Sequence, residues 1–137
     1  MQFADTNVLL YAISRDPGEG AKAARANALL DQGDLGLSVQ VLQEFYVQAT
    51  RASRADALTH DQAAGLVEAW RRFPVQETTV DVLVAALATR QRFGISYWDA
   101  ASSEAARTLA CTVVLSEDLD PGTDYDGVRV VNPFLST

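Results

Sequence analysis

The chain alternates between short apolar segments and longer segments with helical spacing, and this alternation constrains its fold most strongly. Each short segment is bounded by turn or capping residues, as is typical of a strand. The expected strands are Gln2–Ala4, Leu35–Leu37, Pro74–Glu77, Thr112–Leu115 and Val128–Val131. Repeated strand-helix units favour an α/β fold with a short, mainly parallel central sheet and helices on both faces. We therefore expect a three-layer α/β/α arrangement.

Helix start and stop signals lie between these strands. Asp16-Pro17-Gly18-Glu19 combines a cap residue, a proline at the first helical position and an acid, so a helix should run from here to about Gln32, with Gly33 as its stop. The other expected helices are Val8–Ile13, the segment from the Ser38 cap to Ala49, Thr59 to about Arg72, the capping signal Thr78–Asp81 to about Gly94, and Ser96 to Ala105.

Size and composition predict one domain over residues 1–137. The sequence has no apolar run near the roughly 18 residues that a membrane helix needs, and its start lacks the basic and apolar regions of a signal peptide. We therefore expect a cytoplasmic protein without a membrane contact. The single cysteine, Cys111, cannot form an internal disulfide and is read as a small buried hydrophobic residue.

The net charge of -7 argues against broad electrostatic capture of nucleic acid. Any contact with RNA must therefore be local. All the basic residues except Lys22 are arginines, and Arg51, Arg54, Arg71 and Arg72 could form a patch that binds phosphate. Taken singly, each of these arginines is also explained by a solvated helix face.

Acidic residues follow two of the expected strands. Asp5 follows the first strand, and Asp118 follows the strand that ends at Leu115. Because sites in parallel sheets form at the carboxyl ends of the strands, we expect these two acids at one edge of the sheet.

Each acid also has a purely structural explanation. Asp5 could be only a helix cap, and Asp99 fits a capping box with Ser96. Glu44 lies beside the apolar stripe of its helix, which suits either a cleft or a solvated flank. Asp118 lies in an acidic stretch that could be a solvated turn.

Four segments in order nevertheless resemble the acidic motifs of PIN-domain nucleases, and they are Asp5-Thr6-Asn7-Val8-Leu9, Gln43-Glu44-Phe45, Trp98-Asp99-Ala100 and Ser116-Glu117-Asp118-Leu119. Together with the ending Val-Arg-Val-Val-Asn-Pro-Phe, they resemble the VapC-type toxins of toxin-antitoxin pairs in particular.

The resemblance implies a PIN fold and metal-dependent cleavage of RNA by an endoribonuclease. It implies Asp5 and Asp99 as the first choices for direct metal ligands, with Glu44 and Asp118 completing the shell directly or through water. Asp120 could replace Asp118 as the fourth acid. A homodimer and a cognate antitoxin that occupies the active site are also implied, with DNA contacted only through the antitoxin.

The chemistry of carboxylates agrees with a hard divalent cation, Mg²⁺ or Mn²⁺, which prefers oxygen ligands and retains bound waters. Such an ion can activate a water for attack on phosphorus. His60 is the only histidine, so neither paired-histidine catalysis nor a Cys/His zinc cluster is available. The sequence also lacks a Walker loop and a dinucleotide fingerprint.

The chief alternative is a non-catalytic regulatory module that keeps the PIN fold and only binds RNA or protein. Presence of all four acids counts against it. A phosphotransfer receiver domain would need a lysine after a late strand, and Lys22 is the only lysine in the chain.

Overall fold

A mixed sheet forms the centre of the protein in the computed structural model, which describes residues 1–135. Within these residues the sheet has six strands in the order β3-β2-β1-β4-β6-β5. All neighbouring strands are parallel except β5 and β6. The strands are β1 (Gln2–Ala4), β2 (Leu35–Ser38), β3 (Val75–Gln76), β4 (Val113–Leu115), β5 (Asp124–Tyr125) and β6 (Val128–Val131).

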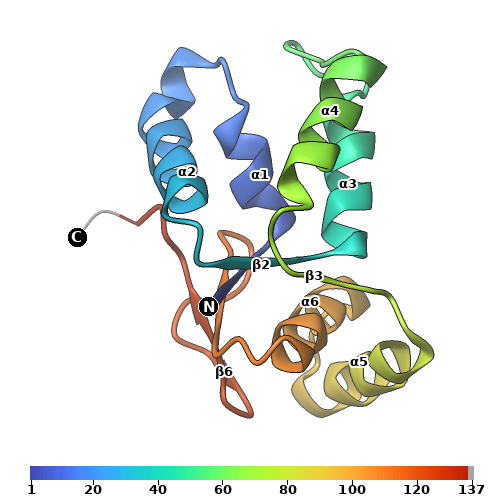
Figure 1. Ribbon diagram of the computed structural model, residues 1–137. Helices are drawn as coiled ribbons and strands as arrows, with labels where there is room; N and C mark the ends of the chain where they lie inside the picture. The colour runs from blue at the N-terminus through green and yellow to red at the C-terminus, as the bar shows by residue number, and fades with distance from the viewer. Residues whose placement is uncertain (136–137) are drawn as a thin grey trace.

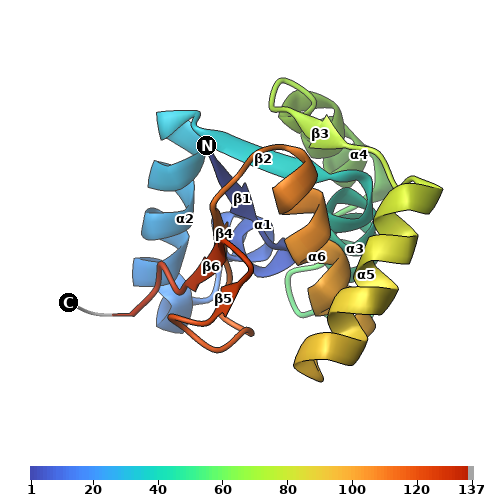
Figure 2. The same ribbon diagram turned by 90° about the horizontal axis from the view of Figure 1, so that it is seen from below.

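Helices cover both faces of this sheet, which confirms the three-layer α/β/α prediction. The six α-helices of residues 1–135 are α1 (Thr6–Ala12), α2 (Gly20–Gln32), α3 (Val39–Ala49), α4 (His60–Trp70), α5 (Val80–Phe93) and α6 (Tyr97–Thr108). In Figure 1, the α1–α2 and α3–α4 pairs stand side by side above β2, whereas α5 and α6 lie below it. Figure 2 shows the same arrangement from below, with α6 next to the sheet and α5 outside it.

The predicted helix signals are mostly confirmed. Ser38 caps α3 through a bond from Val41 N–H to its Oγ (3.1 Å). Both bonds of the predicted capping box at Thr59 are present. Gly33 and Gly94 end α2 and α5 with φ of 78° and 67°, a conformation that glycine adopts without steric cost.

Three details of the prediction were wrong. Asp16 caps a short 3-10 turn (Pro17–Glu19), and α2 begins only at Gly20. The cap of α5 is Thr79 rather than Thr78, since Thr79 Oγ1 accepts the Val82 N–H. Strand β5 is absent from the predicted strands, although it pairs with β6 in a tight hairpin. Asp126-Gly127 is the two-residue, positive-φ connection of this hairpin (φ of 55° and 91°).

The core lies between the sheet and the helices. Phe3, Phe45 and Val114 are fully buried, and Phe45 packs edge-on against Trp70 with ring centroids 4.7 Å apart. Cys111 is buried, as predicted. Trp98 is 61% exposed at the start of α6 and is not part of the core. None of the helices within residues 1–135 has the length and apolar character required to span a bilayer.

Candidate active site

The carboxyl ends of β1, β4 and β6 meet at one edge of the sheet. Asp5 follows β1 directly, and its N–H donates to the carbonyl of Leu115 at the end of β4 (3.0 Å). Ser116 then donates its N–H to Val131 at the end of β6 (3.0 Å). Asp5 also caps α1, because its Oδ1 accepts the Thr6 N–H (2.9 Å). The position predicted for Asp5 is therefore correct, and the residue is both a cap and a group at the sheet edge.

A hydrogen-bond network connects Asp5 with Asp118. The buried hydroxyl of Ser116 donates to Asp5 Oδ2 (2.9 Å), and Ser116 Oγ in turn accepts the Asp118 N–H (3.2 Å). Asn7 Nδ2 lies 3.3 Å from both Ser116 Oγ and Asp118 Oδ2. Asp5 is buried and Asp118 is exposed, so the network extends from the interior to the surface.

Glu44 reaches the same edge from α3. Its Oε2 accepts the hydroxyl of Thr6 (2.7 Å), and Thr6 is the neighbour of Asp5 in the chain. Its Oε1 accepts from Gln40 Nε2 one helical turn earlier (3.0 Å). Glu44 is half-buried, and both of its carboxylate oxygens accept hydrogen bonds from side chains of the protein.

Asp99 is placed at this edge by the direction of α6. A short connection joins the end of α6 to the start of β4, so the helix runs opposite to the parallel strands and its first turn lies near their carboxyl ends. The charges of Asp99 and Asp120, after burial, raise the pKa of Tyr125 above its usual value, so both acids lie near that ring. No contact in residues 1–135 joins the Asp99 side chain directly to Asp5, Glu44 or Asp118.

Within residues 1–135, Asp99 takes part in only one of the two hydrogen bonds of the predicted capping box. Ser96 Oγ accepts the Asp99 N–H (3.1 Å), as in a capping box. The return bond, from Ser96 N–H to the Asp99 carboxylate, is not present among the described residues, in contrast to the complete box at Thr59. The half-buried carboxylate of Asp99 is therefore free to bind another group.

Burial dominates the electrostatics of Asp5. Desolvation is the largest effect and raises the pKa of Asp5 from 3.8 to about 6, against the lowering effect of the bonds from Thr6 and Ser116. The negative charges of Glu44 and Asp118 raise the pKa of Asp5 further. These three acids therefore share one region electrostatically, and no basic side chain of residues 1–135 forms an ion pair with any of them.

Glu117, next to Asp118, is neutralised separately. It pairs with Lys22 of α2 (2.7 Å) and accepts the hydroxyl of Tyr11 on α1 (2.5 Å). The bonds from Lys22 and Tyr11 outweigh partial burial and lower the pKa of Glu117. The sequence could not reveal this pairing, because Lys22 and Glu117 are 95 residues apart.

The oxygen atoms at this edge, which belong to carboxylate, hydroxyl and amide groups, are of the kind that a hard divalent cation prefers as ligands. Within residues 1–135, no three acidic, histidine or cysteine side chains are gathered closely enough to enclose an ion by themselves. A cation here would therefore retain several waters, as Mg²⁺ commonly does in proteins.

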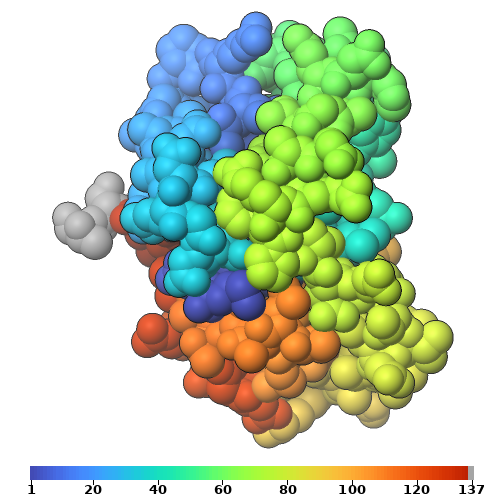
Figure 3. Space-filling view, in the orientation of Figure 1, coloured from blue at the N-terminus to red at the C-terminus, as the bar shows by residue number. Residues whose placement is uncertain are grey.

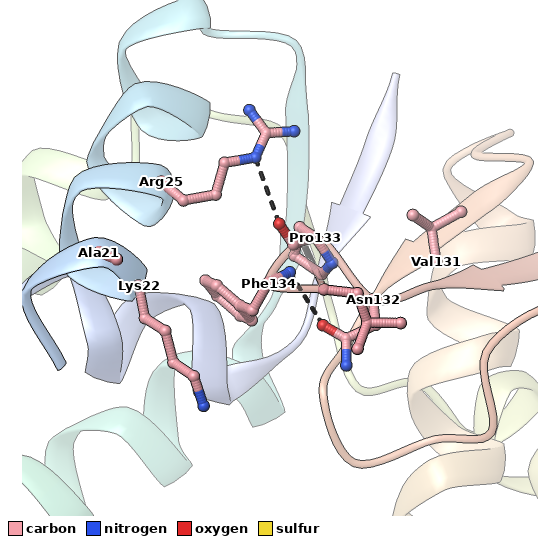
Figure 4. A pocket seen from close by; sticks show the side chains of 8 residues that line it. Ala21, Lys22, Arg25, Val131, Asn132, Pro133 and Phe134 are labelled. Atoms are coloured by element: carbon pink, nitrogen blue, oxygen red, sulfur yellow. Dashed lines mark hydrogen bonds between the residues drawn. The ribbon is translucent and has the colours of Figure 1, made fainter. Parts of the chain in front are cut away.

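A separate pocket lies between α2 and the C-terminal segment (Figure 4). Arg25 Nε donates to the carbonyl of Pro133 (3.4 Å), and Phe134 N–H donates to Asn132 Oδ1 (2.9 Å). No carboxylate lines this pocket in the described part of the chain. We therefore assign these contacts to anchoring of the C-terminal segment on α2.

Ionisation of Asp5 should destabilise the metal-free protein. The protonated form is favoured in the fold, so its stabilising contribution is complete below the unfolded pKa of 3.8 and is lost as the pH rises through about 6. This pKa change corresponds to roughly 3 kcal/mol. Asp5→Asn, which cannot ionise, should therefore gain stability relative to the natural protein as the pH rises from about 4 to neutral.

Urea unfolding in EDTA at several pH values measures this difference in the free energy of unfolding. Loss of the Ser116 bond should cost the variant about 1 kcal/mol at every pH, so the change with pH is the informative quantity. A difference between the two proteins that stays constant with pH would contradict the raised pKa of Asp5.

In a comparison with protein families, the family model described as PIN domain matches residues 3–122. The comparison with curated protein sequences finds no significant match.

Several solved structures share the fold. A toxin-antitoxin complex from Klebsiella pneumoniae has a TM-score of 0.70 at 19% identity, with 98% of each chain covered. VapC20 of Mycobacterium tuberculosis, described as a sarcin-ricin loop cleaving toxin, has a TM-score of 0.66 at 20% identity and covers 86% of this chain and 90% of its own. DNA-bound VapBC from Salmonella typhimurium has a TM-score of 0.65 at 18% identity, and the match covers 94% of this chain and 95% of its own.

Proposed function

This chain belongs to the PIN domain family, and from that premise we propose that it is an endoribonuclease that hydrolyses RNA phosphodiester bonds with a divalent cation, Mg²⁺ or Mn²⁺. The observation that carries the proposal is the buried Asp5, whose pKa is raised to about 6 by burial and by the neighbouring charges of Glu44 and Asp118. Such crowding of acids without a basic partner is costly unless a cation binds.

The side chains of the site have distinct roles in this proposal. When bound, the cation lowers the pKa of a water and neutralises charge on the phosphate oxygens. Asp5 and Asp99 would hold it directly. Glu44 and Asp118 would complete the set of ligands, directly or through water.

The surrounding contacts hold these ligands in place. The Thr6 N–H and the Ser116 hydroxyl fix the two oxygens of Asp5, and Thr6 and Gln40 fix Glu44. Such supporting bonds orient carboxylate ligands and are needed for metal affinity.

Cleavage of total cellular RNA by the purified chain tests this function. We expect cutting with Mg²⁺ or Mn²⁺ and none with EDTA. Binding of RNA without any cutting would favour the alternative, a non-catalytic PIN-fold module, whereas cutting that persists in EDTA would exclude the carboxylate mechanism.

The fourth acid can be identified by a matched pair of variants. Asp118→Asn should lower cleavage by about 10–100-fold, as loss of a ligand or of a partner of a ligand does. Asp120→Asn should leave it within about twofold, because Asp118 and not Asp120 shares the Ser116–Asn7 network with Asp5. Both side chains are exposed, so replacing either carboxylate with an amide should affect the stability of the fold to a similar extent. The reverse order of effects would assign the role to Asp120.

The biological role proposed is that of the toxin in a toxin-antitoxin pair acting in the cytoplasm. The structural neighbours that are toxin-antitoxin proteins, some of them bound to DNA, support this role. A cognate antitoxin would inhibit by pairing a basic group, such as arginine, with the acids in place of the cation. Contact with DNA would then occur only through the antitoxin.

Association with protein is also supported by exposed apolar side chains on α5. Val80, Val84 and Leu87 are 73%, 59% and 52% exposed, and neighbouring exposed apolar groups commonly mark interaction surfaces. A homodimer is our proposal for the free chain, and light scattering of the purified protein measures its mass. A monomeric mass would contradict the homodimer.

A further inference from the structure

Two cavities continue from the acidic edge towards the tips of the two helix pairs. The first, of about 230 Å³, is lined by Asn7, Tyr11, Arg54 and Asp118 among others. The second, of about 420 Å³, is lined by Arg15, Arg54 and Asp56 among others. Both are lined by Glu19 and Arg54, so the two cavities adjoin and together extend from Asp118 to Arg15. We call them together the Arg54 furrow.

The furrow lies between the α1–α2 connection and the α3–α4 connection. The Arg15 N–H donates to Asp56 Oδ2 (3.1 Å), which joins the two connections directly. In Figure 3 the blue α1–α2 end and the green α3–α4 end meet at the top of the molecule. The furrow therefore has walls from two segments about forty residues apart in sequence.

The Arg54 side chain is fixed by Asp56 through its Nε, while its terminal N–H groups have no partner among residues 1–135. Its Nε donates to Asp56 Oδ1 (2.8 Å), and its side chain is 22% exposed. This is the only hydrogen bond that the Arg54 side chain makes within residues 1–135, so the four N–H groups of the terminal nitrogens remain available. The bond from Arg15, together with the charge of Arg54, lowers the pKa of Asp56, which keeps this anchor ionised.

The lining of the furrow carries both signs of charge. Its acids are Asp16, Glu19, Asp56, Glu117 and Asp118, and its bases are Arg15 and Arg54. Two of these acids are already paired, Glu117 with Lys22 and Asp56 with Arg54. At one end is Asp118 of the proposed cation site, where a phosphate would bind only together with the cation. Where the two cavities meet is the fixed guanidinium of Arg54, whose fork of donors matches phosphate oxygens. A strand with phosphates at regular intervals can place one phosphate on the cation beside Asp118 and a neighbouring phosphate on Arg54, whereas a single small anion reaches only one of the two.

We propose that Arg54 binds a backbone phosphate of the RNA strand, beside the phosphate that is cleaved, and that Asp56 positions its guanidinium. This inference rests on the proposed function. It adds a substrate-binding residue outside the four acidic motifs. It also predicts the path of the strand over the surface, from the acids along α1 towards Arg15.

Binding of a fluorescein-labelled single-stranded RNA, measured by anisotropy in EDTA at several salt concentrations, tests the proposal. Arg54→Gln should weaken binding by about tenfold, as loss of a charge-assisted bond does. It should also lower the slope of log affinity against log salt by about 0.7, the value for one phosphate of a single strand. Arg54→Lys keeps the charge and the pair with Asp56, so it should retain the slope and part of the affinity.

Arg92→Gln is the matched control, because Arg92 also pairs with a carboxylate, that of Asp126, but lies on α5 outside the furrow. It should bind RNA as the natural protein does. The proposal is overturned if Arg54→Gln and Arg92→Gln bind equally, or if the natural chain binds no RNA at low salt. RNA that binds through Arg54 but is never cut with Mg²⁺ or Mn²⁺ would instead overturn only the proposed function.

Discussion

Replacing Asp5 with asparagine is expected to lower metal-dependent RNA cleavage by more than about a hundredfold, because a bound cation contributes several kcal/mol of transition-state stabilisation. Asp5 is the most buried of the four acids and accepts bonds from both Thr6 and Ser116, so its position is the best defined. The same variant should fold well, since its metal-free form no longer carries a buried charge at neutral pH.

Asp31→Asn is the control for this prediction. It makes the same chemical change at an exposed position near the end of α2, and its cleavage rate should equal that of the natural protein. Initial rates on one RNA preparation at saturating Mn²⁺ compare the three proteins. A folded Asp5→Asn protein that cuts within about tenfold of the natural rate would contradict the assignment of Asp5.

A second large effect separates the two roles available to Asp99. If its carboxylate binds the cation, Asp99→Asn should lower cleavage by about a hundredfold or more, since even partners of ligands contribute 10–100-fold. Its melting temperature should change little, because the carboxylate makes no return bond to the start of α6. Ser96→Ala should show the reverse, with a loss of about 1 kcal/mol from the missing cap and near-normal cleavage.

Cleavage rates and urea unfolding of the two variants give this comparison. A destabilised Asp99→Asn protein with normal cleavage would show that Asp99 is only a helix cap. An equal loss of cleavage in both variants would show that α6 must be intact for activity, without a specific role for the Asp99 carboxylate.

Much of the fold could be predicted because its signals are local. The alternation of apolar segments predicted the order of five strands, and capping residues such as Ser38 and Thr59 predicted helix starts within a few residues. Because parallel strands end at the same edge, the positions of Asp5 and Asp118 after β1 and β4 predicted that they would lie near each other. Strand β5 was missed because two residues cannot show an alternating pattern.

The site was less predictable because its energetics depend on contacts between distant residues. The Ser96–Asp99 spacing predicted a complete capping box, and only the structure shows that the carboxylate does not close it. Periodicity left Glu44 undecided until the bond from Thr6, 38 residues away, placed it near Asp5. Trp98 could not be separated from core tryptophans, since its exposure depends on where the first turn of α6 lies relative to α5.

The central claim is that these carboxylates bind a divalent cation, and calorimetric titration of Mn²⁺ into the metal-free chain at neutral pH tests it most directly. We expect saturable binding to the natural protein and to Asp31→Asn, and loss of that binding in Asp5→Asn. Saturable binding of equal affinity in Asp5→Asn, or no binding to the natural protein, would contradict the claim.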